Sequence, residues 1–178
     1  ILAVHMRGAP CNMDALLTLA RQHNLKLLED AAQAAGASYR GARLGSIGDA
    51  GAFSFQFNKI ITCGEGGMVI TNDREIFTRA AMYHDVIGGI RNGVPDWKIL
   101  PGVNLRMSEL QAAVALVQLH RLDSLLAEMR RNNRTLRASM ADVSARKGVT
   151  FRKVYDAEGD AAVCLVFYLP QAATAQRV

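Results

Sequence analysis

The sequence has few cysteines, few lysines and no long hydrophobic run, and each shortage excludes a class of protein. Its three cysteines, Cys11, Cys63 and Cys164, are odd in number and far apart, so they form neither a disulfide framework nor a zinc spacing. No apolar run reaches the roughly 18 residues that a membrane span needs, and no charged segment precedes a signal-like core. We therefore expect a soluble, cytoplasmic protein with no metal site and no membrane contact.

The net charge of +5 permits a nucleic-acid partner, but its distribution does not favour one. The arginines are scattered, and no aromatic residues alternate with basic ones as in nucleic-acid binding surfaces. The one cluster, Arg130, Arg131, Arg134 and Arg137, follows a helical pattern and is typical of a solvated helix face. We expect no nucleic-acid partner.

The two ends of the chain suggest a piece of a longer protein. The sequence opens on Ile1, inside the apolar run ILAVH, and closes on QAATAQRV, which has the composition of a helix that has barely begun. The 178 residues between these ends, half of them hydrophobic, are enough for one domain or slightly more.

The N-terminal part predicts an α/β fold. Residues 1–5 form a strand candidate, Asn12 can cap a helix with apolar residues at a 3.6 period, and residues 25–28 form a second apolar strand. A strand, a helix and a strand at this spacing indicate a parallel βαβ unit, and such apolar strands suit a sheet covered on both faces. Further strands are predicted at residues 50–55 and 68–71.

The C-terminal part predicts a long helix and a second domain. A helix capped by Asp73 should end near His84, and a Gly- and Pro-rich loop should follow it. Ser108 and Gln111 form a capping box for a helix over residues 108–141. Its first half is apolar nearly all round and is expected to be buried, although one domain cannot easily cover it. We expect residues 1–141 to belong to a large domain and residues 142–178, with strands at 151–155 and 161–169, to begin a small one.

Lys59 is the first candidate for a chemical role. It is the only lysine in an uncharged, apolar stretch of a chain with 16 arginines and five lysines. A partly desolvated lysine amine can lose its proton and attack a carbonyl, which an arginine cannot do at neutral pH. Lys59 is therefore a candidate Schiff-base lysine, and the alternative is a surface lysine whose stem covers a half-buried loop.

Asp30 and Gln33 form the second candidate pair. The strand predicted at 25–28 delivers Asp30 at its carboxyl end, where open α/β sheets place their sites. The alternative is a helix cap, because Asp30 with Gln33 three residues later matches a capping box. The residues alone leave both open.

Three segments resemble a known family. EDAAQAAGA, GDAGAFSFQFNKIITCGEGGMVITND and NLRMSELQAA, in this order, resemble the DegT/DnrJ/EryC1/StrS family of pyridoxal 5'-phosphate (PLP) aminotransferases. The resemblance covers about residues 1–140 and implies a fold-type-I aminotransferase. It also implies transfer of an amino group, from a donor such as glutamate, to a nucleotide-linked keto sugar or a keto cyclitol.

The resemblance assigns roles to five residues. Lys59 matches the lysine that binds PLP covalently, and Asp30 matches the carboxylate that pairs with the pyridine nitrogen. Gln33 matches the side chain near the phenolic oxygen, and Ser54 matches a phosphate ligand. Asn104 matches an asparagine that reaches the cofactor phosphate of the partner subunit, which implies a homodimer with a shared active site.

Some features depart from the family pattern. Leu105 stands where many members have an aromatic residue, and MYHDVIGGIRNG differs from the commoner basic sequence, both near the expected acceptor site. Also absent is the family's N-terminal half, which would contribute a phosphate-binding turn and a residue that stacks on the cofactor. The alternatives are a PLP-dependent sugar dehydratase, which typically has histidine in place of Lys59, a non-catalytic or regulatory relative, and a dimerisation module.

Overall fold

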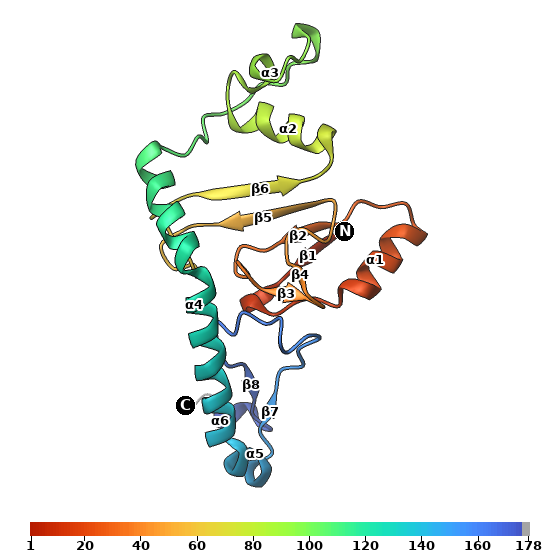
Figure 1. The fold of residues 1–178 in the computed structure, drawn as a ribbon. Coiled ribbons are helices and arrows are strands. Elements are labelled where there is room, and N and C mark those ends of the chain that lie inside the picture. The colour runs from red at the N-terminus through yellow and green to blue at the C-terminus, as the bar shows by residue number, and fades with distance from the viewer. Residues whose placement is uncertain (176–178) are drawn as a thin grey trace.

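The computed structural model describes residues 1–175, which fold around a four-stranded sheet of order β1-β2-β5-β6 (Figure 1). The first three strands are parallel to one another, and β6 is antiparallel to β5. The strands are β1 (Leu2–Val4), β2 (Leu28–Asp30), β5 (Ala50–Ser54) and β6 (Gly67–Thr71). The α/β class predicted from the sequence is confirmed.

The remaining elements are helices and two small hairpin-like pairs. Of the helices in residues 1–175, none combines the length and apolar character needed to cross a membrane. The helices are η1 (Met6–Gly8), α1 (Met13–Gln22), α2 (Arg74–His84), α3 (Gly88–Arg91), η2 (Asp96–Lys98), α4 (Glu109–Ser139), α5 (Ala141–Lys147) and α6 (Ala172–Ala175). The pairs are β3 (Ser38–Tyr39) with β4 (Ala42–Arg43), and β7 (Thr150–Phe151) with β8 (Phe167–Tyr168).

Helix starts were predicted well because their signals are local. The Asn12 side chain accepts a hydrogen bond from the Ala15 amide at 3.3 Å, and the Asp73 side chain caps α2. Ser108 and Gln111 form the predicted capping box at the start of α4. Each cap satisfies amide groups that have no partner inside the helix.

Several predicted boundaries were wrong. The strand expected at 25–28 begins only at Leu28, because its register with β1 starts at the pair Leu2 and Leu28. The segment expected to be loop between α2 and α4 contains α3 and η2, and the late strands have only two residues each. The end of the chain predicted as the beginning of a helix is helical through Ala175, and residues 176–178 lie outside the described residues.

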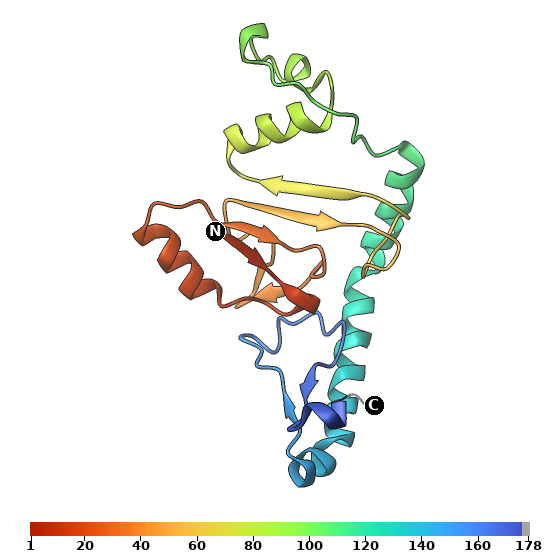
Figure 2. The ribbon, with the colours of Figure 1, turned by 180° about the vertical axis from the view of Figure 1, so that it is seen from behind.

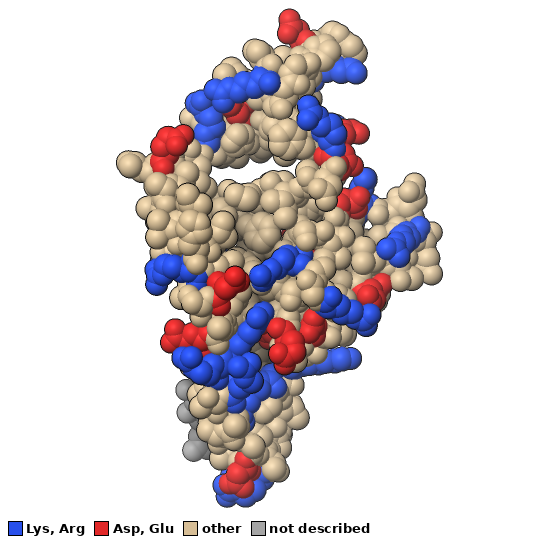
Figure 3. All heavy atoms as spheres, in the orientation of Figure 1, with Lys and Arg blue, Asp and Glu red and all other residues tan. Residues whose placement is uncertain are grey.

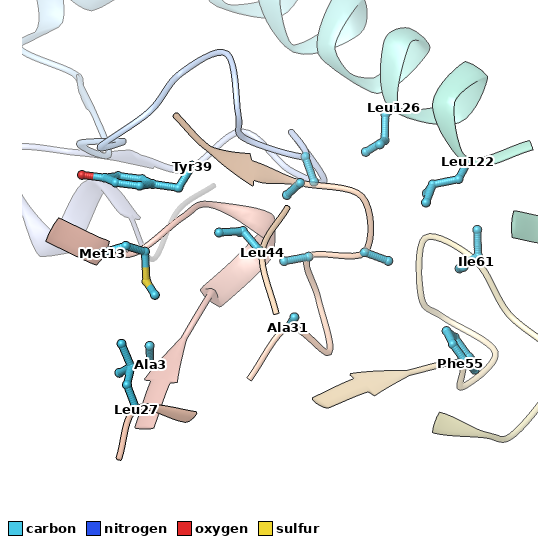
Figure 4. Packing of buried hydrophobic residues seen from close by; sticks show 14 of the residues in the cluster. Ala3, Met13, Leu27, Ala31, Tyr39, Leu44, Phe55, Ile61, Leu122 and Leu126 are labelled. Carbon is cyan, nitrogen blue, oxygen red and sulfur yellow. The ribbon is translucent and has the colours of Figure 1, made fainter. Parts of the chain in front are cut away.

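The core lies on one face of the sheet (Figure 4). On this face Met13 of α1 packs with Ala3 and Leu27, and Leu122 and Leu126 of α4 close the core at its other end. The opposite face, seen from behind in Figure 2, is open: Leu2, Val4 and Leu28 are exposed. The prediction that both faces of the sheet are covered was therefore wrong for this chain.

Helix α4 leaves apolar side chains uncovered in the single chain. Its first half was expected to be buried but not easily covered by one domain, and here Leu110 is 82% exposed. Val114, Leu116, Val117 and Leu119 are exposed to lesser degrees. Its arginine cluster is only partly a solvated face. Arg130 Nε donates to the Asp160 carbonyl at 2.8 Å, and the Arg137 guanidinium lies 4.7 Å from the centre of the Phe151 ring. These two arginines therefore hold the segment after α5, which includes Phe151 and Asp160, against α4.

A buried carboxylate joins three segments beneath the sheet. Glu29 and His5 are each 1% exposed, and His5 Nε2 lies 3.0 Å from a Glu29 carboxylate oxygen. The backbone amides of Gly45, Ile47 and Gly48 donate to the same carboxylate at 2.8, 2.7 and 2.6 Å. A buried carboxylate is costly unless donors surround it, and here four do.

These contacts shift both pKa values of the pair. Burial acts to raise the pKa of Glu29, but the hydrogen bonds from His5 and the three amides outweigh it, so this pKa is lowered. Burial acts to lower the pKa of His5, whereas hydrogen bonds with the Cys11 and Glu29 side chains raise it to about 9. The Cys11 amide also faces His5 Nδ1 at 3.2 Å, and because this contact suits only the neutral ring, it competes with protonation.

We predict that Glu29→Gln lowers the free energy of unfolding by about 3 kcal/mol at pH 7, because it leaves buried donors poorly paired. The lowered pKa of Glu29 stabilises the folded protein fully above the ordinary value of 4.5, and this contribution is lost as the pH falls through the folded-state value. The difference between wild type and variant should therefore shrink below pH 4.5. Urea unfolding from pH 3 to 7, on protein from the complete reading frame, measures it.

The matched control is Glu75→Gln, which changes an exposed carboxylate in the first turn of α2 and should leave stability nearly unchanged. A constant difference between wild type and Glu29→Gln across the whole pH range would contradict the account of this network.

Candidate functional site

Four of the five predicted site residues lie at the carboxyl ends of the parallel strands or in the loops that follow. Because β2 is parallel to both β1 and β5, Val4, Asp30 and Ala52 lie side by side near one edge of the sheet. The loops that follow the three strands start from this edge (Figure 1). Open α/β sheets place their sites there, because the loops meet beside exposed backbone groups.

Asp30 is half-buried at the end of β2 and lies on the sheet face opposite its neighbour Glu29. Its Oδ1 accepts a hydrogen bond from the Ala32 amide at 3.0 Å, which makes a local turn. No helix begins between Asp30 and Ser38, so the alternative of a helix cap was wrong. Within residues 1–175 the second carboxylate oxygen has no hydrogen-bond partner.

Gln33 is held by a residue that sequence reasoning missed. The Arg7 amide donates to Gln33 Oε1 at 2.8 Å, and Arg7 has the uncommon φ of +58° inside the turn after β1. The contact joins residues 26 apart, so no local pattern could reveal it. Because Gln33 Oε1 accepts this hydrogen bond, the Gln33 Nε2 hydrogens are directed away from Arg7 and can donate to another group.

Ser54 and Lys59 lie at the end of β5 and in the loop after it. The Gln56 amide donates to Ser54 Oγ at 3.3 Å, and the Lys59 amide donates to the Gln56 carbonyl at 3.0 Å. The Lys59 side chain is half-buried, and in the described part of the chain its amine forms neither a hydrogen bond nor an ion pair. Buried Phe55 and Ile61 anchor the loop on either side of it.

Asn104 is not brought to these four residues within one chain. It is exposed in the segment between η2 and α4, where its Oδ1 accepts from Arg106 Nε at 3.0 Å and from the Arg106 amide at 3.4 Å. The structure thus places Asp30 and Ser54 at the carboxyl ends of the neighbouring strands β2 and β5, and Gln33 and Lys59 in the loops that follow them. It leaves Asn104 facing solvent.

An apolar cleft of about 770 Å³ opens between the sheet and α2. The hollow is visible between the upper helices and the sheet in Figure 3. Its lining includes Phe53, Met68, Phe77 and Leu105, the last being the residue that departs from the family pattern.

The sequence profile of the DegT/DnrJ/EryC1/StrS aminotransferase family matches residues 1–178. The chain is 46% identical over 131 residues to a GDP-perosamine synthase from Caulobacter vibrioides. This match covers 74% of the chain and 35% of that protein. It is 39% identical over 158 residues to the L-glutamine:2-deoxy-scyllo-inosose aminotransferase from Streptoalloteichus tenebrarius, covering 84% of the chain and 37% of that protein.

The fold is similar to that of a solved aminotransferase from Psychrobacter cryohalolentis, with a TM-score of 0.83 and 34% sequence identity. The similarity covers 96% of this chain and 47% of that one. The chain therefore spans about a third of the length of its curated relatives and about half of the solved structure. By its sequence and its fold, the chain belongs to the DegT/DnrJ/EryC1/StrS aminotransferase family.

Proposed function

We propose that this chain contributes to a PLP-dependent aminotransferase that transfers an amino group from an amino acid, such as glutamate, to a keto sugar or keto cyclitol. A nucleotide-linked keto sugar is the favoured acceptor. The main support is the amine of Lys59, which has no hydrogen bond or ion pair within residues 1–175 and lies in the loop after β5, the strand that pairs with β2 and its Asp30. The printed names of the similar proteins, a GDP-perosamine synthase and an inosose aminotransferase, support this substrate class.

The four gathered side chains fit the polar groups of PLP. A carboxylate, an amide, a hydroxyl and an amine at one edge match its pyridine nitrogen, phenolic oxygen, phosphate and aldehyde. When bound, PLP withdraws electrons from the substrate and so stabilises negative charge on the reacting carbon. In the proposal Asp30 pairs with the nitrogen, Gln33 with the phenolic oxygen and Ser54 with the phosphate, while Lys59 binds the cofactor covalently.

Hydrogen bonds from backbone amides orient three of these side chains for that task. The turn between Asp30 and the Ala32 amide fixes the carboxylate, so its remaining oxygen can hold a proton on the ring nitrogen. The Arg7 amide occupies the Gln33 oxygen and leaves its N–H groups to donate. The Gln56 amide points at Ser54 Oγ, so the hydroxyl proton is free for a phosphate oxygen.

Lys59 moves the proton in this scheme. With PLP bound, the Lys59 amine would be the group that accepts a proton from one substrate carbon and returns it to another. Its half-buried position limits the water around the amine. The presence of lysine, where sugar dehydratases of this family typically carry histidine, favours amino transfer over dehydration.

The domain boundaries and the cellular location of the protein are part of the same proposal. We propose a large domain over residues 1–141 and the start of a small domain over 142–178, supported by the end of α4 at Ser139 and the separate β7–β8 pair. A cytoplasmic location rests on the three scattered cysteines, which are free in the structure.

We also propose a homodimer with a shared active site. Asn104 faces solvent in one chain, and the apolar side chains at the start of α4 are uncovered there. Exposed apolar surface of this kind ordinarily marks an interface, and closed two-fold pairing is the commonest arrangement. A second copy would cover this surface and receive Asn104 beside its own Lys59.

The first prediction of this proposal is that Lys59 forms the covalent bond with PLP. Borohydride reduction of the PLP-loaded protein from the complete reading frame, followed by peptide mapping, should place the adduct on Lys59. Lys59→Ala should abolish both the adduct and transamination, whereas the control Lys98→Ala, in η2, should preserve both. An adduct on Lys26 or Lys98 would refute the assignment.

The second prediction is that Asp30→Asn leaves a folded protein with transamination reduced at least about 100-fold, because the ring nitrogen is no longer held protonated. Asparagine can keep the turn to the Ala32 amide, so stability should fall by about 1 kcal/mol or less. Turnover rates and urea unfolding measure the two effects. Near-normal turnover would leave Asp30 with a structural role only.

The third prediction tests the shared site by complementation. Chains with Lys59→Ala and chains with Asn104→Asp should each be inactive, but their heterodimer contains one site with both residues intact. Equal mixing under conditions of subunit exchange should restore up to about a quarter of wild-type activity, since half of the dimers carry one good site of two. No recovery despite exchange, or full activity of a monomer in sedimentation, would rule out the shared site.

A further inference from the structure

We propose that Asp85 is a positioning residue that fixes the side-chain orientation of Asn104 through Arg106. This inference rests on the proposed function, in which Asn104 binds the cofactor phosphate of the partner subunit. Within residues 1–175, none of the three residues forms a hydrogen bond or an ion pair with Asp30, Gln33, Ser54 or Lys59. Asp85, Arg106 and Asn104 meet where the segment before α4 passes the end of α2.

The backbone of this segment is fixed against the end of α2. The Val103 amide donates to the Tyr83 carbonyl at 2.8 Å, and the Leu105 amide donates to the His84 carbonyl at 2.9 Å. Gly102 lies so close to the Met82 carbonyl that a Cβ at this position would clash. Asn104 therefore has a defined backbone position although its side chain is exposed.

Asp85 supplies a buried negative charge beside this segment. It is 3% exposed, and its carboxylate accepts hydrogen bonds from Arg91 Nη1 at 2.8 Å and from the Ile87 amide at 3.2 Å. Its Oδ1 also lies 3.9 Å from Arg106 Nε. A buried carboxylate needs cations around it, so it restricts the exposed Arg106 side chain to a position near α2.

The same Arg106 nitrogen determines how the Asn104 amide faces. Arg106 Nε donates to Asn104 Oδ1 at 3.0 Å, and the Arg106 backbone amide adds a second, longer contact at 3.4 Å. Since donors occupy the oxygen, both N–H groups of Asn104 Nδ2 point away from it. An outward pair of N–H donors suits an anionic oxygen, such as one on a phosphate, and does not suit a cation.

Without Asp85 the Arg106 side chain would lose the charge that holds it, and the Asn104 amide could turn its oxygen outward. Part of the binding energy toward the phosphate would then be spent on reorienting the amide. The role of Asp85 is thus preorganisation of a donor that it does not touch.

The test measures the dissociation constants of PLP and of pyridoxal, which lacks the phosphate, by absorbance titration of protein from the complete reading frame. We expect Asn104→Ala, Asp85→Asn and Arg106→Gln each to weaken PLP binding about tenfold, and pyridoxal binding much less. Arg106→Gln probes the same contact from the solvent side, where a folding defect is not expected. The matched controls Asp96→Asn and Lys98→Gln change the same charges in η2 and should leave both constants unchanged.

A double-mutant cycle separates positioning from a structural effect. If Asp85 acts through Asn104, then Asp85→Asn should cause no further loss of PLP affinity in the Asn104→Ala background. An undiminished loss in that background, or an equal loss for pyridoxal, would overturn the positioning role alone. If Asn104→Ala itself leaves PLP affinity unchanged, the proposed role of Asn104 fails, and the inference about Asp85 fails with it.

Discussion

The Glu29 carboxylate is the contact on which the arrangement of the site depends. It takes hydrogen bonds from His5, which follows β1, and from the amides of Gly45, Ile47 and Gly48, which precede β5. One buried charge thus fixes the turn after β1 and the loop before β5, the two strands that lie on either side of β2. A loss of this charge would disturb both neighbours of the strand that carries Asp30.

The features predicted correctly are those whose signals lie within a few residues. The Asn12 cap and the Ser108–Gln111 box involve residues three positions apart, and the structure forms both. The start of β2 was missed because the apolar run from Leu25 gives no information on register, which depends on a partner 26 residues away. The apolar pattern at the start of α4 predicts a surface that one domain cannot easily cover, and Leu110 is exposed in the single chain, but periodicity does not report what covers that surface.

The site was predicted by a different route. Asp30 was a candidate because it lies at the end of a strand, and Lys59 was a candidate because it is the only lysine in an apolar stretch. For each residue a structural alternative stayed open until the resemblance to a family was considered. The residues that orient the site escaped both routes. Arg7 acts through its backbone amide, which every residue type except proline offers, and Asp85 acts through Arg106, 21 positions away. Contacts of this kind become visible only in three dimensions.

Glu29 and Asp30 are neighbours with opposite surroundings, one enclosed by donors and the other open at the site. Since side chains alternate across a strand, moving the pairing of β2 by a single position would exchange them. The site would then receive glutamate in place of aspartate, and the enclosed position would receive a carboxylate one methylene too short for its four donors. Strand β2 therefore tolerates a substitution at Leu28 more readily than an insertion or deletion before Glu29. The length of this strand is constrained more strictly than its composition.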